Sequence, residues 1–194
     1  MSAAAKILVI RLSSFGDIVL TFPFLNELRR LYPQSQIDFV LKEQYAELVR
    51  LHKSINNIIV YNDSLSLNKN EYDVVFDLQR NVKSRKILPS NSKIFKVRKE
   101  TWKKHLLVYT KINLLEDPIP VYRKYLNALK EFNSSAKTEF TKSKLLTQDT
   151  NYLQGNYGVI SPSSKHFTKR YPKEYYIDLF KDVKMNVALT GDNN

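Results

Sequence analysis

The sequence predicts an α/β fold in which helices cover both faces of a parallel sheet. Short apolar runs with strand character alternate along the chain with segments whose apolar residues recur at helical spacing. The runs at 6–12 and 72–78 are rich in apolar residues, as expected of strands buried on both faces, and each is followed by a polar turn. Alternation of this kind is typical of βαβ units, whose strands pair in parallel.

The first expected unit spans residues 1–135 and begins in the order β-α-β-α-β. The helix expected over 17–32 accommodates Pro23 in the first turn of its main part, because a missing N–H is tolerated there, and Pro33 ends it. The other elements expected here are strands at 36–41, 55–61, 72–78 and 93–97 and helices at 43–52, 82–88, 101–112 and 122–132.

Residues 136–156 are expected to be a linker, since this segment is rich in Ser, Thr and Lys and only weakly periodic. A second unit, 157–194, restarts the pattern with a strand at 157–160, a basic loop at 161–172, a helix at 173–183 and a strand at 185–189. The helix is expected to turn Tyr176, Leu179 and Phe180 inward. One β-α-β unit is too small to be stable alone, so we expect this one to be the incomplete start of a domain.

The charge of the chain indicates an anionic partner. Thirty-one Lys and Arg oppose nineteen Asp and Glu, a formal net charge of +12. Ten of these basic residues and one acid, Glu100, lie between Arg80 and Lys104. The run is read either as a solvated basic surface or as a docking face for an anion. A nucleic-acid partner would rest on charge alone, because no reading motif accompanies it, and none is expected.

Several classes of protein are excluded by composition. The chain has no cysteine, which rules out disulfides, thiolate zinc sites and a cysteine nucleophile. Its three scattered histidines make a histidine-built metal site improbable, so we expect no metal. No apolar run reaches the roughly 18 to 20 residues of a membrane span, and the first run does not have the flanks of a signal peptide. We therefore expect a cytoplasmic protein.

The polar turn after the first strand is the leading candidate for a site. Its strand delivers Ser13, Ser14, Gly16 and Asp17 to the carboxyl edge of the sheet, where open α/β sheets bind ligands. The turn lacks the three spaced glycines of a dinucleotide fingerprint. Asp17 is either a functional carboxylate or a helix cap, and the serines and glycine either meet a ligand or form an ordinary turn.

Four blocks of sequence together resemble glycosyltransferase family 9, the lipopolysaccharide heptosyltransferases. The blocks, in chain order, are RLSSFGDIVLTFPFLNELRRLYP (11–33), YDVVFDLQRNVKSR (72–85), VYRKYLNAL (121–129) and ISPSSKHFTKRYPKEYY (160–176). Their order and spacing make the resemblance specific, and it covers nearly all of this chain. It extends over only the first half to two thirds of a typical family member.

The resemblance implies a GT-B architecture of two Rossmann-like domains. Residues 1–135 would form the acceptor-side domain and 157–194 the start of the donor-side domain. Such enzymes transfer heptose from ADP-heptose to the inner core of lipopolysaccharide, inverting the anomeric centre and using no metal or other cofactor. The absence of an Asp-x-Asp pair agrees with the last point. The implied partners are the nucleotide-sugar and a phosphorylated lipid-linked oligosaccharide, with peripheral contact to the inner face of the inner membrane.

The same resemblance implies roles for individual residues. Asp17 would be the general base, and Lys169 would stabilise the charge of the leaving diphosphate. The full set of implied binding residues is Ser163, Ser164, Lys169 and Arg170 for the donor and Asp77, Gln79, Arg80 and Lys83 for the acceptor, with Ser13, Ser14 and Gly16 contacting the donor or shaping the turn. The alternatives are a capping carboxylate for Asp77 and a solvated loop for Lys169 and Arg170.

A second function remains open. The later segment of family members carries an Asp-Ser-Gly-x-x-His type motif that helps hold the nucleotide, and nothing in this chain matches it. The alternative to a glycosyltransferase is therefore a non-catalytic module that binds anionic glycan or lipid.

Overall fold

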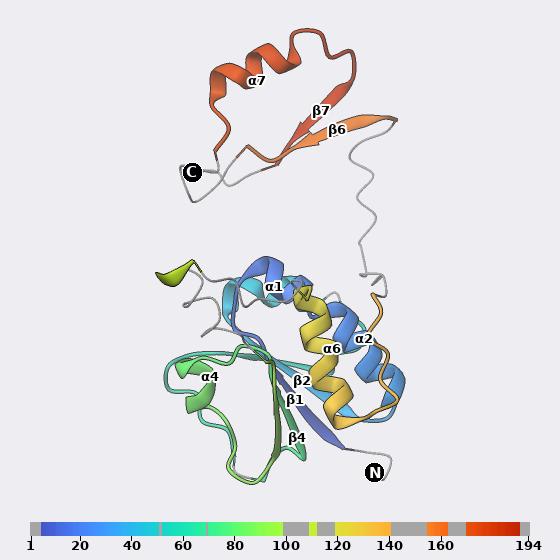
Figure 1. The fold of residues 1–194 in the computed structure, drawn as a ribbon, viewed down its shortest axis with the longest axis vertical. Coiled ribbons are helices and arrows are strands. Elements are labelled where there is room, and N and C mark those ends of the chain that lie inside the picture. Colours follow the sequence, from blue (N-terminus) through green and yellow to red (C-terminus); the bar gives the residue numbers. More distant parts are fainter. Residues whose placement is uncertain are drawn as a thin grey trace. The chain divides into compact units, whose positions relative to one another are not determined.

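The computed structural model describes residues 5–50, 52–68, 70–98, 109–111, 119–140, 155–162 and 170–190 (Figure 1). The chain divides into two compact units, residues 1–146 and 147–194. Each unit contains a sheet whose strands pair in parallel. The α/β class expected from the sequence is confirmed.

The first unit is built on a five-stranded sheet with the order β3-β2-β1-β4-β5. The chain proceeds outward from β1 to β3 and then returns to the other side of β1 to form β4, so the order reverses between β1 and β4. In an open α/β sheet this switch point leaves a crevice at the carboxyl ends of the strands. The strands are β1 (Lys6–Ile10), β2 (Gln36–Leu41), β3 (Asn57–Val60), β4 (Val74–Asp77) and β5 (Lys93–Lys96).

The helices of this unit mostly occupy the expected positions. They are α1 (Phe15–Val19), α2 (Phe22–Leu31), the 3₁₀ turn η1 (Glu43–Tyr45), α3 (Ala46–Arg50), α4 (Val82–Lys86) and α6 (Val121–Phe132). The helix expected over 17–32 is divided near Thr21, and Pro23 lies in the first turn of α2 as expected. The helix expected over 43–52 begins with η1 and ends at Arg50. Most of the helix expected over 101–112 lies outside the described residues.

Two hydrophobic clusters cover the two faces of the first sheet. On one face, Val9 and Phe76 pack with α2 and α6, and the rings of Phe24 and Phe76 meet edge to face with centroids 5.0 Å apart. On the other face, Leu8 and Val75 pack with side chains from the 61–72 connection and from the end of α4. Figure 1 shows α2 and α6 side by side, with α4 beyond the sheet. Burial on both faces explains why β1 and β4 are apolar except for one residue at an end of each strand.

The second unit contains β6 (Tyr157–Ile160), α7 (Lys173–Phe180) and β7 (Asn186–Leu189), and its strands pair in parallel. Tyr176 and Phe180 are half-buried, as expected for inward residues. The expectation for Leu179 was wrong, because 58% of this residue is exposed. The described part of this unit contains a sheet of only two strands. The surface of this sheet is too small to cover every apolar side chain of α7.

Among the described residues, no helix combines the length and the apolar character needed to cross a bilayer.

Candidate functional site

The polar turns after β1 and β4 are joined by the side chain of Gln79. Its Oε1 accepts hydrogen bonds from the backbone N–H groups of Leu12 at 3.1 Å and Ser13 at 3.3 Å. Because β1 and β4 are neighbouring parallel strands, both turns lie at the switch point of the sheet. The two turns therefore share one location, as their positions after the strands predicted.

Asp77, at the end of β4, is a structural part of its turn. Its side chain is fully buried, and Oδ1 accepts from the N–H groups of Gln79 at 3.1 Å and Arg80 at 2.7 Å. Oδ2 accepts from the Ser84 hydroxyl at 3.0 Å. Ser84 also forms a capping box with Asn81 at the start of α4. This arrangement corresponds to the capping role left open by the sequence and leaves no exposed oxygen for an acceptor.

Asp17 has a different environment, although it also follows a strand of this sheet. It lies in the first turn of α1, and one third of its side chain is exposed. Its carboxylate is ion-paired with the Arg11 guanidinium and accepts a hydrogen bond from the Ser14 hydroxyl at 3.1 Å. These partners are side chains rather than the N–H groups of its own helix, so Asp17 does not have the bonding of a helix cap.

Ser14 and Gly16 are exposed at the edge of this site, and Ser13 beside them is half-buried. Ser14 is the N-cap residue of α1, with an extended backbone, and its side chain bonds Asp17 instead of a helix N–H group. The peptide bond between Ser13 and Ser14 is cis. Gly16 is exposed, and a Cβ built on it would meet nothing within 4 Å. The space above Gly16 is therefore open.

Arg11 and Tyr125 belong to this site and were not among the residues that the sequence singled out. Arg11 is only 8% exposed; its Nη1 donates to the carbonyl oxygen of Leu78 at 2.8 Å, and its guanidinium lies 5.8 Å from the centre of the Tyr125 ring. A signal was present in the sequence, since Arg11 is the only charged residue between Ile7 and Gly16. Nothing in the sequence places Tyr125 near it.

The Tyr125 hydroxyl is protonated throughout the physiological range. Burial raises the pKa of Tyr125 to about 12, the positive charge of Arg11 acts against this shift, and the negative charge of Asp17 adds to it. Two buried polar atoms have no hydrogen-bond partner here, Nε of Arg11 and the hydroxyl oxygen of Tyr125. Arg11 and Tyr125 are therefore buried together next to the Asp17 carboxylate.

The two basic candidates after β4 point to different neighbours. Arg80 is half-buried, adopts a positive φ of 47°, and donates through Nη1 to the carbonyl oxygen of Val97 at 2.9 Å. Lys83 is exposed and donates to Asp63 at 3.3 Å, with its ammonium 5.8 Å from the centre of the Tyr61 ring. The contacts described here for Arg80 and Lys83 are therefore with different partners.

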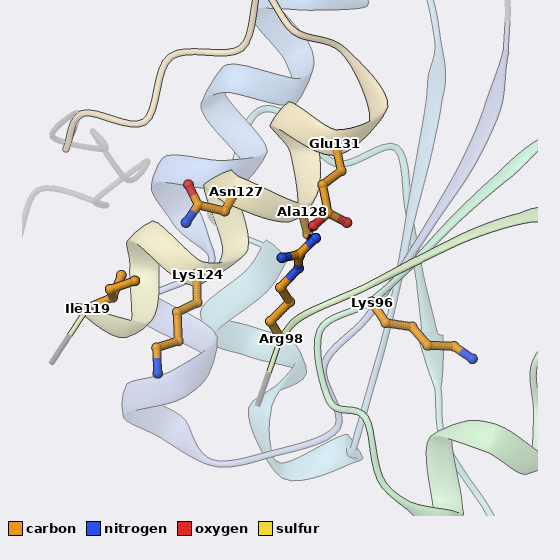
Figure 2. Close-up of a pocket in the computed structure, with 7 residues that line it drawn as sticks. All are labelled: Lys96, Arg98, Ile119, Lys124, Asn127, Ala128 and Glu131. Atoms are coloured by element: carbon orange, nitrogen blue, oxygen red, sulfur yellow. Dashed lines mark ion pairs between the residues drawn. The ribbon is translucent and has the colours of Figure 1, made fainter. Parts of the chain in front are cut away.

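A pocket of about 260 Å³ lies between the end of β5 and α6 (Figure 2). It holds three cationic side chains, from Lys96, Arg98 and Lys124, together with the amide of Asn127. Arg98 forms an ion pair with Glu131, at 2.9 Å from Nε to Oε1. The wall also includes Ile119 and Ala128. Lys96 and Arg98 belong to the basic run between Arg80 and Lys104, whereas the pocket residues from Ile119 to Glu131 had no predicted role in binding.

In the second unit, only one of the four donor candidates is described. Arg170 is exposed and lies shortly before the first turn of α7. Ser163, Ser164 and Lys169 lie outside the described residues. Among the residues that the structure does describe, no group of three or more His, Cys, Asp or Glu side chains is arranged to hold a metal ion.

Comparison with solved structures identifies the fold. Escherichia coli heptosyltransferase WaaC with ADP aligns with a TM-score of 0.67 and 19% identity over 95% of this chain and 66% of its own. E. coli ADP-heptose lipopolysaccharide heptosyltransferase II aligns with a TM-score of 0.69 and 19% identity over 97% of this chain and 65% of its own. The chain has the fold of the heptosyltransferases. It spans about two thirds of the length of these two proteins.

Two further comparisons agree with the resemblance read from the sequence. A family 9 glycosyltransferase from Veillonella parvula aligns with a TM-score of 0.66 and 15% identity over 98% of this chain and 70% of its own. The lipopolysaccharide heptosyltransferase 1 of Pseudomonas aeruginosa is 33% identical over 54 residues, which is 28% of this chain and 15% of that protein. No protein-family profile matches the chain.

Proposed function

We propose that this chain is a glycosyltransferase of the heptosyltransferase type. It would transfer heptose from ADP-heptose to the inner core of lipopolysaccharide, inverting the anomeric centre and using no metal. The observation that carries the proposal is the Asp17 carboxylate, partly open to solvent at the switch point of a sheet that has the heptosyltransferase fold. Two solved neighbours are described as WaaC with ADP and with ADP-2-deoxy-2-fluoro heptose, which supports the choice of donor.

In the proposed reaction Asp17 is the general base. The acceptor hydroxyl oxygen attacks the anomeric carbon, its proton passes to the Asp17 carboxylate, and the bond between that carbon and the diphosphate oxygen breaks to release ADP. Negative charge accumulates on the leaving diphosphate, and cations placed there stabilise the transition state. We assign that task to Lys169 and Arg170, with hydrogen bonds from Ser163 and Ser164. The phosphorylated acceptor would meet Arg80 and Lys83 beside the Gln79 turn.

The test is transfer by the intact chain, measured as ADP release from ADP-heptose in the presence of inner-core acceptor. Asp17→Asn removes the base and is expected to lower kcat at least 100-fold, within the usual contribution of general base catalysis. Glu47→Gln is the matched control, because this exposed carboxylate is paired with Arg50 on α3 and belongs to neither of the turns that form the site. Full activity of folded Asp17→Asn would rule out the base.

A binding module for anionic glycan or lipid is the second candidate, and the cationic pocket of Figure 2 favours it. Lys124 is half-buried there and lines the pocket together with Lys96 and Arg98, so the pocket gathers positive charge that a phosphate can pair with. Inorganic phosphate, titrated against the chain and followed by amide NMR shifts, is expected to bind at the pocket. Lys124→Ala should weaken this binding, whereas Arg123→Ala, an exposed neighbour outside the pocket lining, should not.

The two functions are separated by the donor. Saturable binding of ADP-heptose together with ADP release supports the transferase. Phosphate binding with no detectable ADP-heptose binding supports the module. The transferase function would place the chain on the cytoplasmic side of the inner membrane, where its net charge of +12 favours contact with anionic lipid.

A further inference from the structure

We propose that Arg11 is the positioning residue that turns the Asp17 carboxylate into an oriented base. This inference rests on the proposed function, since it assigns a task to Arg11 within that reaction. Arg11 would act through Asp17 and would not touch the acceptor itself, because only 8% of it is exposed.

Both the backbone and the side chain of Arg11 are held in place by neighbouring groups. Its backbone N–H donates to the carbonyl oxygen of Val40 at 3.1 Å, which extends the β1 ladder by one residue. Its Nη1 donates to the carbonyl oxygen of Leu78 at 2.8 Å, and its guanidinium faces the buried Tyr125 ring. Since the backbone of Arg11 is bonded to β2 and its Nη1 to the residue that follows β4, its Nη2 is fixed relative to the sheet. A planar fork of this kind is unique to arginine.

Within the described part of the chain, the Arg11 and Ser14 contacts of the Asp17 carboxylate both fall on one oxygen. Nη2 of Arg11 pairs with Oδ2, and the Ser14 hydroxyl also donates to Oδ2. The other oxygen, Oδ1, is left available to receive a proton. A general base needs one anchored oxygen to fix the geometry and one free lone pair pointing to the reacting hydroxyl. The arrangement around Asp17 supplies both.

The anchor matters because the helix that carries Asp17 is short. Helix α1 has five residues, and one third of the Asp17 side chain is in contact with solvent. Ser14, the other partner, is itself exposed and lies on the same turn. Arg11 is therefore the only one of the two partners that ties the carboxylate to the buried sheet.

Steady-state kinetics of the intact chain tests the role. Arg11→Met keeps the aliphatic stem and removes the charge and the fork, and is expected to lower kcat 10- to 100-fold while KM for ADP-heptose stays within twofold. Arg11→Lys restores a charge near Oδ2 and should recover at least fivefold of that loss. Arg50→Met, which breaks the exposed pair of Arg50 with Glu47, is the matched control and should leave kcat unchanged. A folded Arg11→Met protein with kcat within twofold of wild type would overturn the proposal.

Two further measurements separate this inference from the function on which it rests. If Arg11 acts through Asp17, Asp17→Asn and the double variant Arg11→Met/Asp17→Asn have the same residual rate; a further loss in the double variant contradicts the role. The ¹³C resonance of the Asp17 carboxyl, recorded on the chain without substrate, should move in Arg11→Met and return toward its original position in Arg11→Lys. An unmoved resonance overturns the inference even if transfer is confirmed, whereas a chain without transfer activity refutes the function alone.

Discussion

Two aspartates that follow neighbouring strands have different environments, which assigns a structural role to one and leaves the other open to solvent. Asp77 is fully buried, and both of its oxygens are occupied by three donors of its own turn and helix. Asp17 is partly exposed, and its two partners share one oxygen. Removing a donor from Asp77 would damage the turn, whereas part of the Asp17 side chain is open to solvent, as the proposed role of base requires. The same residue type therefore has different environments after two neighbouring strands.

Gly16 provides a test in which stability and function should move in opposite directions. It lies inside α1 with a negative or extended φ and open space where a Cβ would stand, so Gly16→Ala introduces neither strain nor a clash. Alanine in a helix is more favourable than glycine by roughly 0.5–1 kcal/mol, and we expect stability in urea to rise by up to that amount. If the donor or the acceptor binds close to the backbone of Gly16, the added methyl group of Gly16→Ala should raise KM for that substrate at least threefold. Unchanged kinetics would show that Gly16 only shapes the turn.

His52 predicts a pH dependence of stability. It is buried against the Phe22 ring with centroids 4.7 Å apart, its Nδ1 accepts from the Ser54 N–H, and burial lowers the pKa of His52 to about 4. The unfolded chain binds a proton near the ordinary pKa of about 6.5 and the folded chain does not, so stability is present above that pH and is lost as pH falls from about 6.5 to 4. The loss is on the order of 3 kcal/mol from this group.

Urea unfolding at several pH values checks this prediction. His52→Asn keeps a hydrogen-bond acceptor but cannot titrate, so its unfolding free energy should fall less steeply between pH 6.5 and 4 than that of the wild type. Parallel curves for the two proteins would assign the acid sensitivity to other groups.

At the scale of elements, Arg29 links α2 by hydrogen bonds to the two loops at 32–35 and 54–56. Nη1 donates to the carbonyl oxygens of Tyr32, Pro33 and Ser35, and Nη2 donates to the carbonyl oxygen of Ser54 and to Oδ1 of Asn56. The same Asn56 oxygen accepts from the N–H of Ile37 at 2.8 Å, so the fork also braces the start of β2. One side chain thereby satisfies the carbonyl groups of two chain reversals.

Arg29→Ala is expected to destabilise the first unit by about 2–4 kcal/mol, because several partly buried acceptors lose a charged donor. Arg50→Ala removes an exposed pair spaced three residues apart on α3 and should change stability by less than about 0.5 kcal/mol. Chemical denaturation of both variants makes the comparison. Equal effects would mean that water replaces Arg29 without penalty.

Most elements of the first unit were predictable because their residues have one strong local pattern. The β1 and β4 runs are apolar except for Lys6 and Asp77 at their ends, and the Pro23 position within α2 follows from the missing N–H of proline. The turns after these strands were placed at one edge for the same reason. The sequence could not predict which residues far apart in the chain contact each other in the fold. Arg11 meets Tyr125 from 114 residues away in the chain, Gln79 bonds Leu12 across 67 residues, and no spacing rule predicts either pair.

At the scale of the whole molecule, the first unit concentrates the burial of the chain. Both hydrophobic clusters lie within residues 1–146. In the described part of the second unit, 155–162 and 170–190, no residue is fully buried, and Val159 and Leu189 on its strands are 61% and 73% exposed. Since burial of apolar surface is the dominant stabilising contribution, the two units should differ widely in local stability.

Hydrogen exchange of the intact chain, followed by mass spectrometry, measures this difference. Amides of β1 and β4 are hydrogen-bonded within a sheet buried on both faces and should exchange only through global unfolding of the first unit, whereas those of β6 and β7 are paired in a sheet of two strands with exposed side chains. We expect β6 and β7 to exchange at least 100-fold faster. If ADP-heptose binds the second unit as proposed, its addition should slow that exchange, because a ligand that binds only the folded form stabilises it by mass action. Protection of β6 and β7 equal to that of β1 without ligand would contradict the burial argument.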